Sequence, residues 1–541
     1  MTDRRTMLAG AAALTLPRFA IAQTDQRPRL TVAVQKISNS NTLEPPREQS
    51  NVGFRLSPSF AETLIGSDWT GELAPVPGLA TAWRRLDDRT VEFELRSGVQ
   101  FHDGAILRAE DVVFSFGPDR LFGHADTTAK SGLPQTPSGL LAGAADKEPP
   151  REVSATARRT YPGFERIEIV CPGVVRFVNR QPDATLEGRI AQNVGVILSQ
   201  QGFSAAETWL SWARRPIGTG PYRIAEFRPD VSVTLTSHDR YWGGRPSARE
   251  IRLVEVPEVA SRINGLFAGE FDFICDIPPD QITTIERNDR FEVLGSPINN
   301  IRLITFDSHH PLLTDPRIRR ALSLAVDRAA IVEALWAGRT RVPRGLQLEF
   351  YGDMFIRDRA LPAFDPAKAR ALVKQAGYRG DPIPYRLLNN YYTNQTATAQ
   401  ILVEMWRSVG LNVQIEMREN WQQVNDASTP RGIRDWSCTS LFNDPVSALV
   451  RSMGPRGELQ LNHEWSNNAF NRLSAILETS TDRMARRSAF AHMLDIAEIE
   501  DPAYLILHQA ATFTAKRKDI AWKPSKAWAL DFRASNLRFG S

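Results

Sequence analysis

Strand-type and helix-type segments follow one another along most of the chain, and their order differs between its two parts. Before about residue 300, short apolar runs such as 30–34 and alternating runs such as 90–95 are typical of β-strands. Two pairs of such runs are spaced as β-hairpins: 165–170 with 174–178, and 222–227 with 231–236. Beyond Pro316, helical periodicity alternates with short strands. This order predicts a mixed α/β or α+β fold with two lobes.

The helices expected in the second part begin at acidic residues or prolines and end near glycines. We expect them at 317–337, 366–376, 397–409 and 470–478. Short strands are expected between them at 303–306, 413–416 and 437–441. Earlier in the chain, a helix is expected to begin at Ala109, and residues 123–162 have the Thr, Ser, Ala, Gly and Pro content of a long surface loop.

The length and charge of the chain exclude several classes of protein. Its 541 residues are several times the size of one domain, and 42% hydrophobic with 24% charged residues is the composition of a globular protein. The net charge of +4 is small for this length, so it gives no strong field that would attract nucleic acid or an anionic membrane. We therefore expect no nucleic-acid partner.

The N-terminus has the pattern of an export signal. Arg4 and Arg5 precede an apolar run from Met7 to Leu16, and the sequence Ala-Ile-Ala ends at Ala22. The paired arginines before a weakly hydrophobic stretch are typical of a twin-arginine signal, with an ordinary Sec signal as the alternative. A buried N-terminal helix is a further alternative. Cleavage after Ala22 would leave no cysteine for a lipid anchor, so we expect a soluble periplasmic protein.

The sequence lacks the motifs of the common catalytic and metal-binding classes. It contains no G-x-S-x-G, H-E-x-x-H, G-x-x-x-x-G-K-[ST] or G-x-G-x-x-G pattern. The three cysteines lie far apart, and the adjacent His309 and His310 would face opposite sides of a strand. We therefore expect no catalytic residues, no metal site and no cofactor.

A set of ordered motifs covers about residues 30–530. It comprises Glu62–Leu64, Asp68, Gly71, Pro77–Ala80 with Trp83, Val91–Gly104, Ala109–Val112, Pro216–Tyr222, Tyr241–Gly243, Gly269–Asp272, Asp315–Leu322 with Ala325–Arg328, and Asp365–Ala369. Together these motifs resemble the family-5 extracellular solute-binding proteins, the dipeptide, oligopeptide and nickel type of ABC importer. Most of these motifs are expected to stabilise the fold and not to bind the ligand. Gly218–Pro221, for example, is expected to need the backbone freedom of glycine at a corner.

The resemblance implies a two-lobed periplasmic-binding-protein fold, type II-like, with an additional small domain. The first domain would comprise 23–75, 190–300 and 508–541, the small second domain 76–189, and the third 301–507. Two crossings, near Asn300–Phe306 and Leu505–Phe513, would form the hinge, and the ligand would be enclosed between the lobes. The resemblance further implies a monomer whose partners are an ABC permease and an ATPase in the inner membrane.

One tract departs from the pattern of peptide-binding relatives, in which a Trp-x-x-Asp-x-x-Asp-Pro sequence supplies an aspartate for the α-ammonium group of the peptide. Here the corresponding positions are Thr439, counted from Trp436, or Leu441, counted from Pro445. A buried ammonium group without a counter-charge is costly, so a free peptide N-terminus is a poorer ligand. Asp444 or Asp435 remains an alternative carboxylate. The hydroxyl groups of Ser437, Thr439 and Ser440 would instead suit a neutral solute.

Other candidate ligand-binding residues are flat aromatic or amide side chains near the expected cleft. Aromatic faces suit sugars, peptide side chains and cationic groups, but they also form ordinary cores. The candidates are Asn41, Asn394, Trp421, Trp436, Ser440, Asp444 and Trp465.

The sequence therefore predicts the substrate-binding component of an ABC importer that captures a peptide-like or other small organic solute. The alternative is an exported hydrolase acting on a glycoside or peptide in the same cleft, which would require two shielded, facing carboxylic acids.

Overall fold

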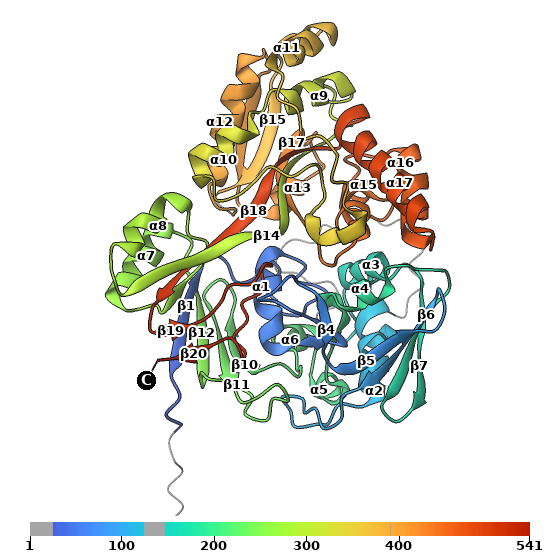
Figure 1. Cartoon of the computed structure of the whole chain (residues 1–541), viewed down its shortest axis with the longest axis vertical. Coiled ribbons are helices and arrows are strands. Elements are labelled where there is room, and N and C mark those ends of the chain that lie inside the picture. The colour runs from blue at the N-terminus through green and yellow to red at the C-terminus, as the bar shows by residue number, and fades with distance from the viewer. Residues whose placement is uncertain (1–24, 124–146, 390, 541) are drawn as a thin grey trace, which may run out of the picture.

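The computed structural model describes residues 25–123, 147–389 and 391–540, so the predicted export signal lies outside the described residues. A ten-stranded mixed sheet runs through the molecule (Figure 1). Its strands are, in spatial order, β10 (Tyr222–Arg228), β11 (Ser232–Ser237), β12 (Glu250–Glu255), β1 (Arg29–Val34), β13 (Phe273–Ile274), β18 (Tyr504–Arg517), β14 (Phe291–Phe306), β17 (Ile433–Thr439), β15 (Ile383–Leu388) and β16 (Val413–Arg418).

Two long strands in the middle of this sheet, β14 and β18, join two halves of the molecule (Figure 1). We call the described residues of 25–290 and 518–540 the lower half, and those of 307–503 the upper half. The antiparallel pairing of β14 and β18 shifts register between Pro297 and Ile301, and the upper part of β14 then pairs with β17. The two halves are therefore connected by paired strands and not by a helix.

Parallel pairing occurs on both sides of the linking strands. In the lower half β1 is parallel to β12 and β13, and in the upper half β15 is parallel to β16 and β17. Four of the six side chains of β1 are buried, and the last three of these are consecutive, as expected for a strand covered on both faces.

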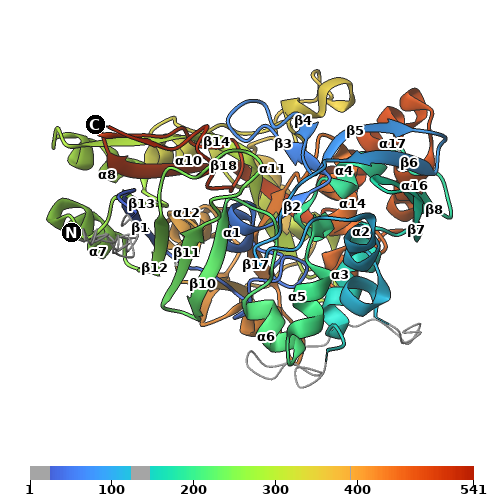
Figure 2. The same cartoon turned by 90° about the horizontal axis from the view of Figure 1, so that it is seen from below.

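A second sheet lies at the far side of the lower half from β1 (Figures 1 and 2). It contains β5 (Ala80–Arg85), β6 (Thr90–Leu95), β8 (Val174–Asn179) and β7 (Phe164–Cys171), all antiparallel. Three short pairs complete the strands: β2 (Glu62–Thr63) with β9 (Val196–Ile197), β3 (Ile65–Ser67) with β4 (Pro75–Pro77), and β19 (Ile520–Ala521) with β20 (Arg538–Phe539).

The helices cover both halves, and many begin at a side chain that caps the first turn, such as Ser50, Asp327, Asn467 and Asp482. The lower half contains α1 (Asn51–Phe60), α2 (Ala109–Ser115), α3 (Arg151–Thr160), α4 (Leu186–Ile190), α5 (Gln200–Ala205), α6 (Trp209–Arg214), α7 (Val259–Ala268) and α8 (Pro279–Glu286). The upper half contains α9 (Pro316–Leu324), α10 (Arg328–Trp336), α11 (Pro366–Gln375), α12 (Gln395–Ser408), α13 (Trp421–Asn425), α14 (Leu449–Met453), α15 (Glu458–Leu461), α16 (Asn468–Thr479) and α17 (Arg483–Asp495). Short 3-10 or π turns are η1 (Pro118–Phe122), η2 (Asn193–Gly195), η3 (Glu349–Met354), η4 (Pro445–Ser447) and η5 (Ile496–Glu500).

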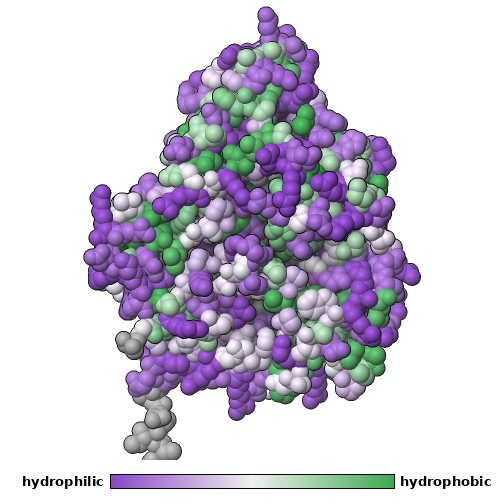
Figure 3. Space-filling view, in the orientation of Figure 1, coloured by the Kyte–Doolittle hydropathy of each residue, from purple (hydrophilic) through white to green (hydrophobic). Residues whose placement is uncertain are grey.

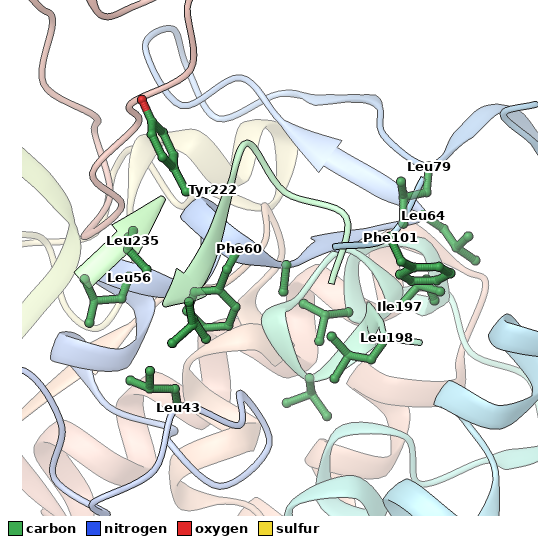
Figure 4. Packing of buried hydrophobic residues seen from close by; sticks show 14 of the residues in the cluster. Leu43, Leu56, Phe60, Leu64, Leu79, Phe101, Ile197, Leu198, Tyr222 and Leu235 are labelled. Carbon is green, nitrogen blue, oxygen red and sulfur yellow. The ribbon is translucent and has the colours of Figure 1, made fainter. Parts of the chain in front are cut away.

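The largest hydrophobic cluster fills the lower half and extends from the ten-stranded sheet to the second sheet. Figure 4 shows part of it, with Leu56 and Phe60 of α1 between Leu43 and the strand residues Tyr222 and Leu235. Because α1 contributes its apolar side chains to this core, the first turn of α1 is held in a fixed position facing the upper half.

The structure confirms most of the expected elements and corrects four of them. Residues 317–337 form two helices, because Asp327 accepts a hydrogen bond from Ala330 N and caps a new helix. The expected surface loop 123–162 contains helix α3 in its described part. The strand expected at 303–306 is the end of the longer β14, and the strand expected at 437–441 ends at Thr439.

A further correction concerns the glycines of 218–221. Neither Gly218 nor Gly220 has a positive φ, so left-handed backbone freedom is not the reason for glycine here. A Cβ atom on Gly218 would lie 2.2 Å from the carbonyl oxygen of Phe60, and one on Gly220 would lie 2.7 Å from the Phe60 carbonyl carbon. The glycines therefore allow this segment to pass against the end of α1.

The face seen in Figure 3 is covered mostly by hydrophilic residues, with hydrophobic residues in separate patches. Within the described ranges, no helix combines the length and apolar character needed to cross a membrane. The three cysteines, which are all described, are free: Cys171 is exposed, and Cys275 and Cys438 are buried.

Candidate functional site

The larger of two adjacent cavities lies where the lower and upper halves meet and has a volume of about 130 Å³. Helix α1, the segment 61–78 and the C-terminal segment 527–533 form its lower walls, and the end of β17 with the residues after it forms its upper wall. Its walls are largely aromatic and aliphatic, as in many small-molecule sites. The main apolar side chains are Phe54, Trp69, Val76, Trp242, Leu441 and Trp528.

The smaller cavity, of about 30 Å³, lies on the other side of Trp528, which borders both cavities. It is lined by the first turns of α1, by Asp276 after β13, by the linking strands β14 and β18, and by Trp336 at the end of α10. The residues just before α12, Tyr391 and Tyr392, close it from the upper half. Charged and aromatic side chains therefore converge here from segments that are distant in the sequence.

Polar side chains join the two halves around these cavities. Nδ2 of Asn51, at the start of α1, donates to Oγ of Ser437 at 3.3 Å, and Nδ2 of Asn39 donates to the hydroxyl group of Tyr391 at 3.1 Å. Oγ1 of Thr439 donates to Oδ1 of Asn51 at 3.5 Å. These bonds hold the upper half against α1, so the cavities are enclosed from both sides.

Two buried ion pairs border the smaller cavity. Nη2 of Arg55 lies 2.8 Å from each carboxylate oxygen of Asp276, and Nη2 of Arg302 lies 2.6 Å from Oδ1 of Asp435. The guanidinium carbon of Arg302 lies 3.4 Å from the ring centre of Tyr392, which is a cation–π distance. Each positive charge at the cavity is therefore balanced by one carboxylate.

Burial shifts the pKa values of these groups. Burial raises the pKa of Asp435, although its contact with Arg302 opposes the shift. Burial lowers the pKa of Arg55, but the carboxylate of Asp276 outweighs that effect, so the pKa of Arg55 is raised. Arg55 therefore stays charged at any physiological pH.

The structure places three of the predicted residues near the cavities but not on their walls. Asn41 lies in the loop after β1 with a φ of 56° and lines neither cavity. Asn394 donates from Nδ2 to the carbonyl oxygen of Leu335 at 2.8 Å and so ties the start of α12 to α10. The ring of Trp421 contacts that of Tyr391 edge-on, with centroids 5.1 Å apart. Trp421 therefore supports a wall residue from behind.

Trp436 and Trp465 have structural partners. The ring of Trp436 lies 4.6 Å from the guanidinium carbon of Arg434, and its carbonyl oxygen accepts a hydrogen bond from Arg302. Trp465 is buried in the core of the upper half and donates from Nε1 to the carbonyl oxygen of Asp501 at 3.0 Å. Neither tryptophan lines the two cavities.

Ser440 and Asp444 line neither of these two cavities, although Asp444 lines a third cavity together with Tyr351 and Arg486. The hydroxyl group of Ser440 is 2.6 Å from that of Tyr351. The carboxylate of Asp444 accepts hydrogen bonds from Val446 N and from Arg486 at 2.8 Å. Of the two carboxylates considered as replacements for the missing aspartate, Asp444 is therefore engaged by Arg486 and Asp435 by Arg302.

The cavity residues that sequence reasoning missed are Arg55, Asp276, Trp336 and Trp528. They come from α1, the end of β13, the end of α10 and the C-terminal segment. No local pattern marks them, because each stands alone in its segment and only the folded sheet brings them together. Among the described residues, no group of three His, Cys, Asp or Glu side chains has the arrangement of a metal site.

Comparisons with known proteins agree with this architecture. Residues 74–453 match the model of bacterial extracellular solute-binding proteins, family 5 Middle. The chain is 26% identical over 552 residues to di/tripeptide-binding protein 2 of Pseudomonas aeruginosa (strain UCBPP-PA14), covering 97% of this chain and 98% of that protein.

Solved structures show the same fold. The DppA periplasmic binding protein of Helicobacter pylori, in complex with the peptide STSA, has a TM-score of 0.80 at 18% identity and covers 95% of this chain and 99% of its own. NikA of Staphylococcus aureus, in complex with Ni(L-His)2, has a TM-score of 0.76 at 15% identity and covers 94% and 99%. Because one fold holds such different ligands, it does not by itself identify the solute. The chain belongs to the bacterial extracellular solute-binding proteins of family 5.

Proposed function

We propose that the protein is the periplasmic binding component of an ABC importer, which encloses a small organic solute between its two halves and delivers it to a permease driven by an ATPase. The observation that carries this proposal is the pair of cavities at the contact between the halves, with walls from both. The match to family 5 supports a role in transport. The comparisons give no support to the alternative of a hydrolase.

The ligand class follows from the chemistry of the tract around β17. The relative in Pseudomonas aeruginosa is named for di- and tripeptides, which supports a peptide-like solute. However, the tract presents Thr439 and Leu441 to the larger cavity, and both of these side chains are uncharged. We therefore propose a peptide-like or other small organic solute whose recognition does not depend on an α-ammonium group.

We propose that the chain divides into three domains, 23–75 with 190–300 and 508–541, 76–189, and 301–507, and that this division allows the protein to close around its ligand. We propose that 76–189, which contains the second sheet, moves with the first domain as one lobe and that 301–507 forms the other. Residues 300–306 of β14 and 505–513 of β18 would be the hinge. Their pairing is interrupted by a register shift between Pro297 and Ile301, where fewer ladder hydrogen bonds resist bending.

Thermal unfolding of the purified chain from residue 23 tests the proposal. A library of dipeptides, tripeptides, opine-like acids and sugars should contain members that raise the melting temperature, because a ligand that binds the native state stabilises it by mass action. Mass spectrometry of the incubated ligand should show no conversion. Formation of a product would contradict the receptor role.

A blocking variant and its control locate the site. Leu441→Trp fills the larger cavity with an indole ring and should abolish the ligand-induced stabilisation. Leu86→Trp changes an exposed side chain of the lower half and should leave it intact. Equal stabilisation of both variants would show that the solute does not bind in this cavity.

A further inference from the structure

The smaller cavity contains several hydrogen-bond donors without an acceptor. The side chains of Arg55, Trp336 and Trp528 line this cavity, and Nη1 of Arg55, Nε1 of Trp336 and Nε1 of Trp528 are buried without a hydrogen-bond partner among the described residues. The Arg55 side chain as a whole is only 6% exposed, and Trp336 is 2% exposed. A buried donor that stays unpaired costs about 1–3 kcal/mol, so three in one cavity point to an acceptor that arrives from outside.

The geometry of Arg55 leaves one edge of its guanidinium group for such an acceptor. Asp276 receives Nη2 at both of its oxygens and so fixes the plane of the group, while Nη1 remains unpaired. Arg302, the other arginine of this cavity, differs, because its Nη1 donates to the Trp436 carbonyl oxygen and its Nη2 to Asp435. Of the two arginines, Arg55 is therefore the one whose Nη1 group remains available to an acceptor.

The acceptor that fits these donors is a carboxylate. A carboxylate offers two oxygens with about four acceptor positions, and hydrogen bonds to it from a guanidinium group are roughly twice as strong as neutral ones. The volume of about 30 Å³ holds a group of this size and not a whole solute. The rest of the molecule would then extend past Trp528 into the larger cavity, which Trp528 also borders.

The residues of the larger cavity carry unpaired polar atoms of both kinds: the acceptors Oδ1 of Asn299 and Oε1 of Gln192, and the donor Nδ2 of Asn193. Oδ1 of Asn299, which lines it, is buried and has no donor among the described residues, whereas Nδ2 of Asn299 donates to the Ser440 carbonyl oxygen at 2.6 Å. An amide N–H or a hydroxyl group of the solute would satisfy Oδ1. The two cavities therefore suit a molecule with a carboxylate at one end and a neutral donor at the other.

We infer that the smaller cavity binds the carboxylate group of the transported solute through Arg55, Trp336 and Trp528. This inference rests on the proposed receptor function and specifies its substrate class: small organic acids that carry a neutral hydrogen-bond donor, such as acylated or peptide-like acids. Asp276 acts as a positioning residue that orients Arg55.

Matched ligand pairs test the inference. Dipeptides, tripeptides and N-acyl amino acids are each titrated by calorimetry as the free acid and as the primary amide. For every member that binds, the acid should bind at least tenfold more tightly than its amide, because the amide loses the charge that Arg55 recognises. Equal affinity of acid and amide would overturn the inference and leave the receptor function standing; binding by no member would overturn both.

Three variants assign the effect to the named donors. Trp336→Phe and Trp528→Phe keep an aromatic ring and remove only the N–H group, and each should weaken acid binding about three- to tenfold. Trp83→Phe removes an indole N–H from β5, outside both cavities, and should leave acid binding unchanged. Melting curves without ligand show that each variant is folded. Unchanged acid affinity in both Trp336→Phe and Trp528→Phe would overturn the inference.

Discussion

Arg189 in α4 and Glu478 in α16 form a buried ion pair between the lower and upper halves, with Nη2 and Oε1 2.9 Å apart. Their side chains are 5% and 11% exposed. Arg189 also contacts Asp183 of its own half, and Glu478 contacts Arg456 of its own half, so each keeps one partner when the halves separate. The Arg189–Glu478 pair is thus a contact that belongs to the arrangement in which the cavities are enclosed.

Weakening this pair should therefore weaken ligand binding. In Glu478→Gln the closed arrangement loses a charge-assisted contact while each half stays intact, and the dissociation constant for a bound solute should rise about tenfold, which corresponds to about 1.4 kcal/mol. Calorimetric titration measures it. Arg456→Gln is the control, because Arg456 is 47% exposed and pairs with Glu478 within the upper half. An unchanged dissociation constant in Glu478→Gln would show that the pair does not contribute to closure.

A second contact between the halves is repulsive. Arg159 of α3 and Arg451 of α14 line one small cavity, and the buried Nε of Arg159 has no hydrogen-bond partner within the described ranges. The pKa of Arg159 is lowered to about 10, because burial disfavours its charge and Arg451 repels it, and these effects outweigh the attraction of Glu458. We therefore expect Arg159→Met to raise the free energy of unfolding by about 1 kcal/mol, since a well-packed apolar side chain replaces an unpaired charge.

Urea unfolding of Arg159→Met and Arg158→Met checks this expectation. Arg158, the neighbouring residue, donates to the carbonyl oxygen of Phe122 at 3.1 Å, so its replacement should be neutral or destabilising. A loss of stability in Arg159→Met would mean that Arg159 has a favourable role that the repulsion does not reveal.

The elements that could be predicted from the sequence are those whose signals are local. Alternation of apolar and polar residues located β6 and the two hairpins, and a capping residue with periodic apolar positions located α11. The sequence predicts one continuous helix over 317–337 and misses the break, because an aspartate within a helical pattern, here Asp327, can equally cap a new helix. Local sequence patterns therefore predict the presence of a helix or strand more accurately than the residues at which it begins and ends.

The cavity walls could not be predicted in the same way. Trp436 is a candidate as an aromatic side chain near the expected cleft, yet its ring contacts Arg434 and lines neither cavity. Trp528, in the C-terminal segment, borders both cavities without any motif around it. The pairing of β14 with β17 and β18 decides which aromatic side chain faces a cleft. This register joins residues that are distant in the sequence, so it cannot be predicted from any single segment.

The close contact of Gly218 with α1 gives a prediction about stability. A Cβ atom there would lie 2.2 Å from the Phe60 carbonyl oxygen and 3.0 Å from the Cα atom of Ala61, so the backbone of α1 would have to shift. We expect Gly218→Ala to lower the free energy of unfolding by about 1–3 kcal/mol. Gly66→Ala is the control, since its Cβ atom would meet the side chain of Val76 at an ordinary 3.4 Å. Equal urea midpoints for both variants would contradict the steric explanation.

His508, in the linking strand β18, should make the protein sensitive to acid. The side chain is 2% exposed, its Nδ1 lies 2.8 Å from the Gln509 carbonyl oxygen, and its ring contacts Trp336. Burial, with a smaller contribution from the positive charge of Arg302, lowers the pKa of His508 to about 3. The unfolded chain, in which histidine has a pKa near 6.5, therefore takes up a proton first as the pH falls, and stability decreases from about pH 6.5 to about pH 3.

The size of this effect follows from the two pKa values. Between pH 7 and pH 5 the unfolded state gains about 2 kcal/mol from protonation of this one histidine, while the folded state gains none. His508→Asn lacks the titrating group, so its free energy of unfolding should fall by about 2 kcal/mol less than that of the unmodified protein over the same interval. The comparison uses urea unfolding at both pH values, so that the titration of all other groups cancels. Identical pH dependence of the two proteins would mean that His508 is already protonated in the folded state at pH 5. An acceptor or a counter-charge in the cavity beside Trp336 would then have to stabilise the charged ring.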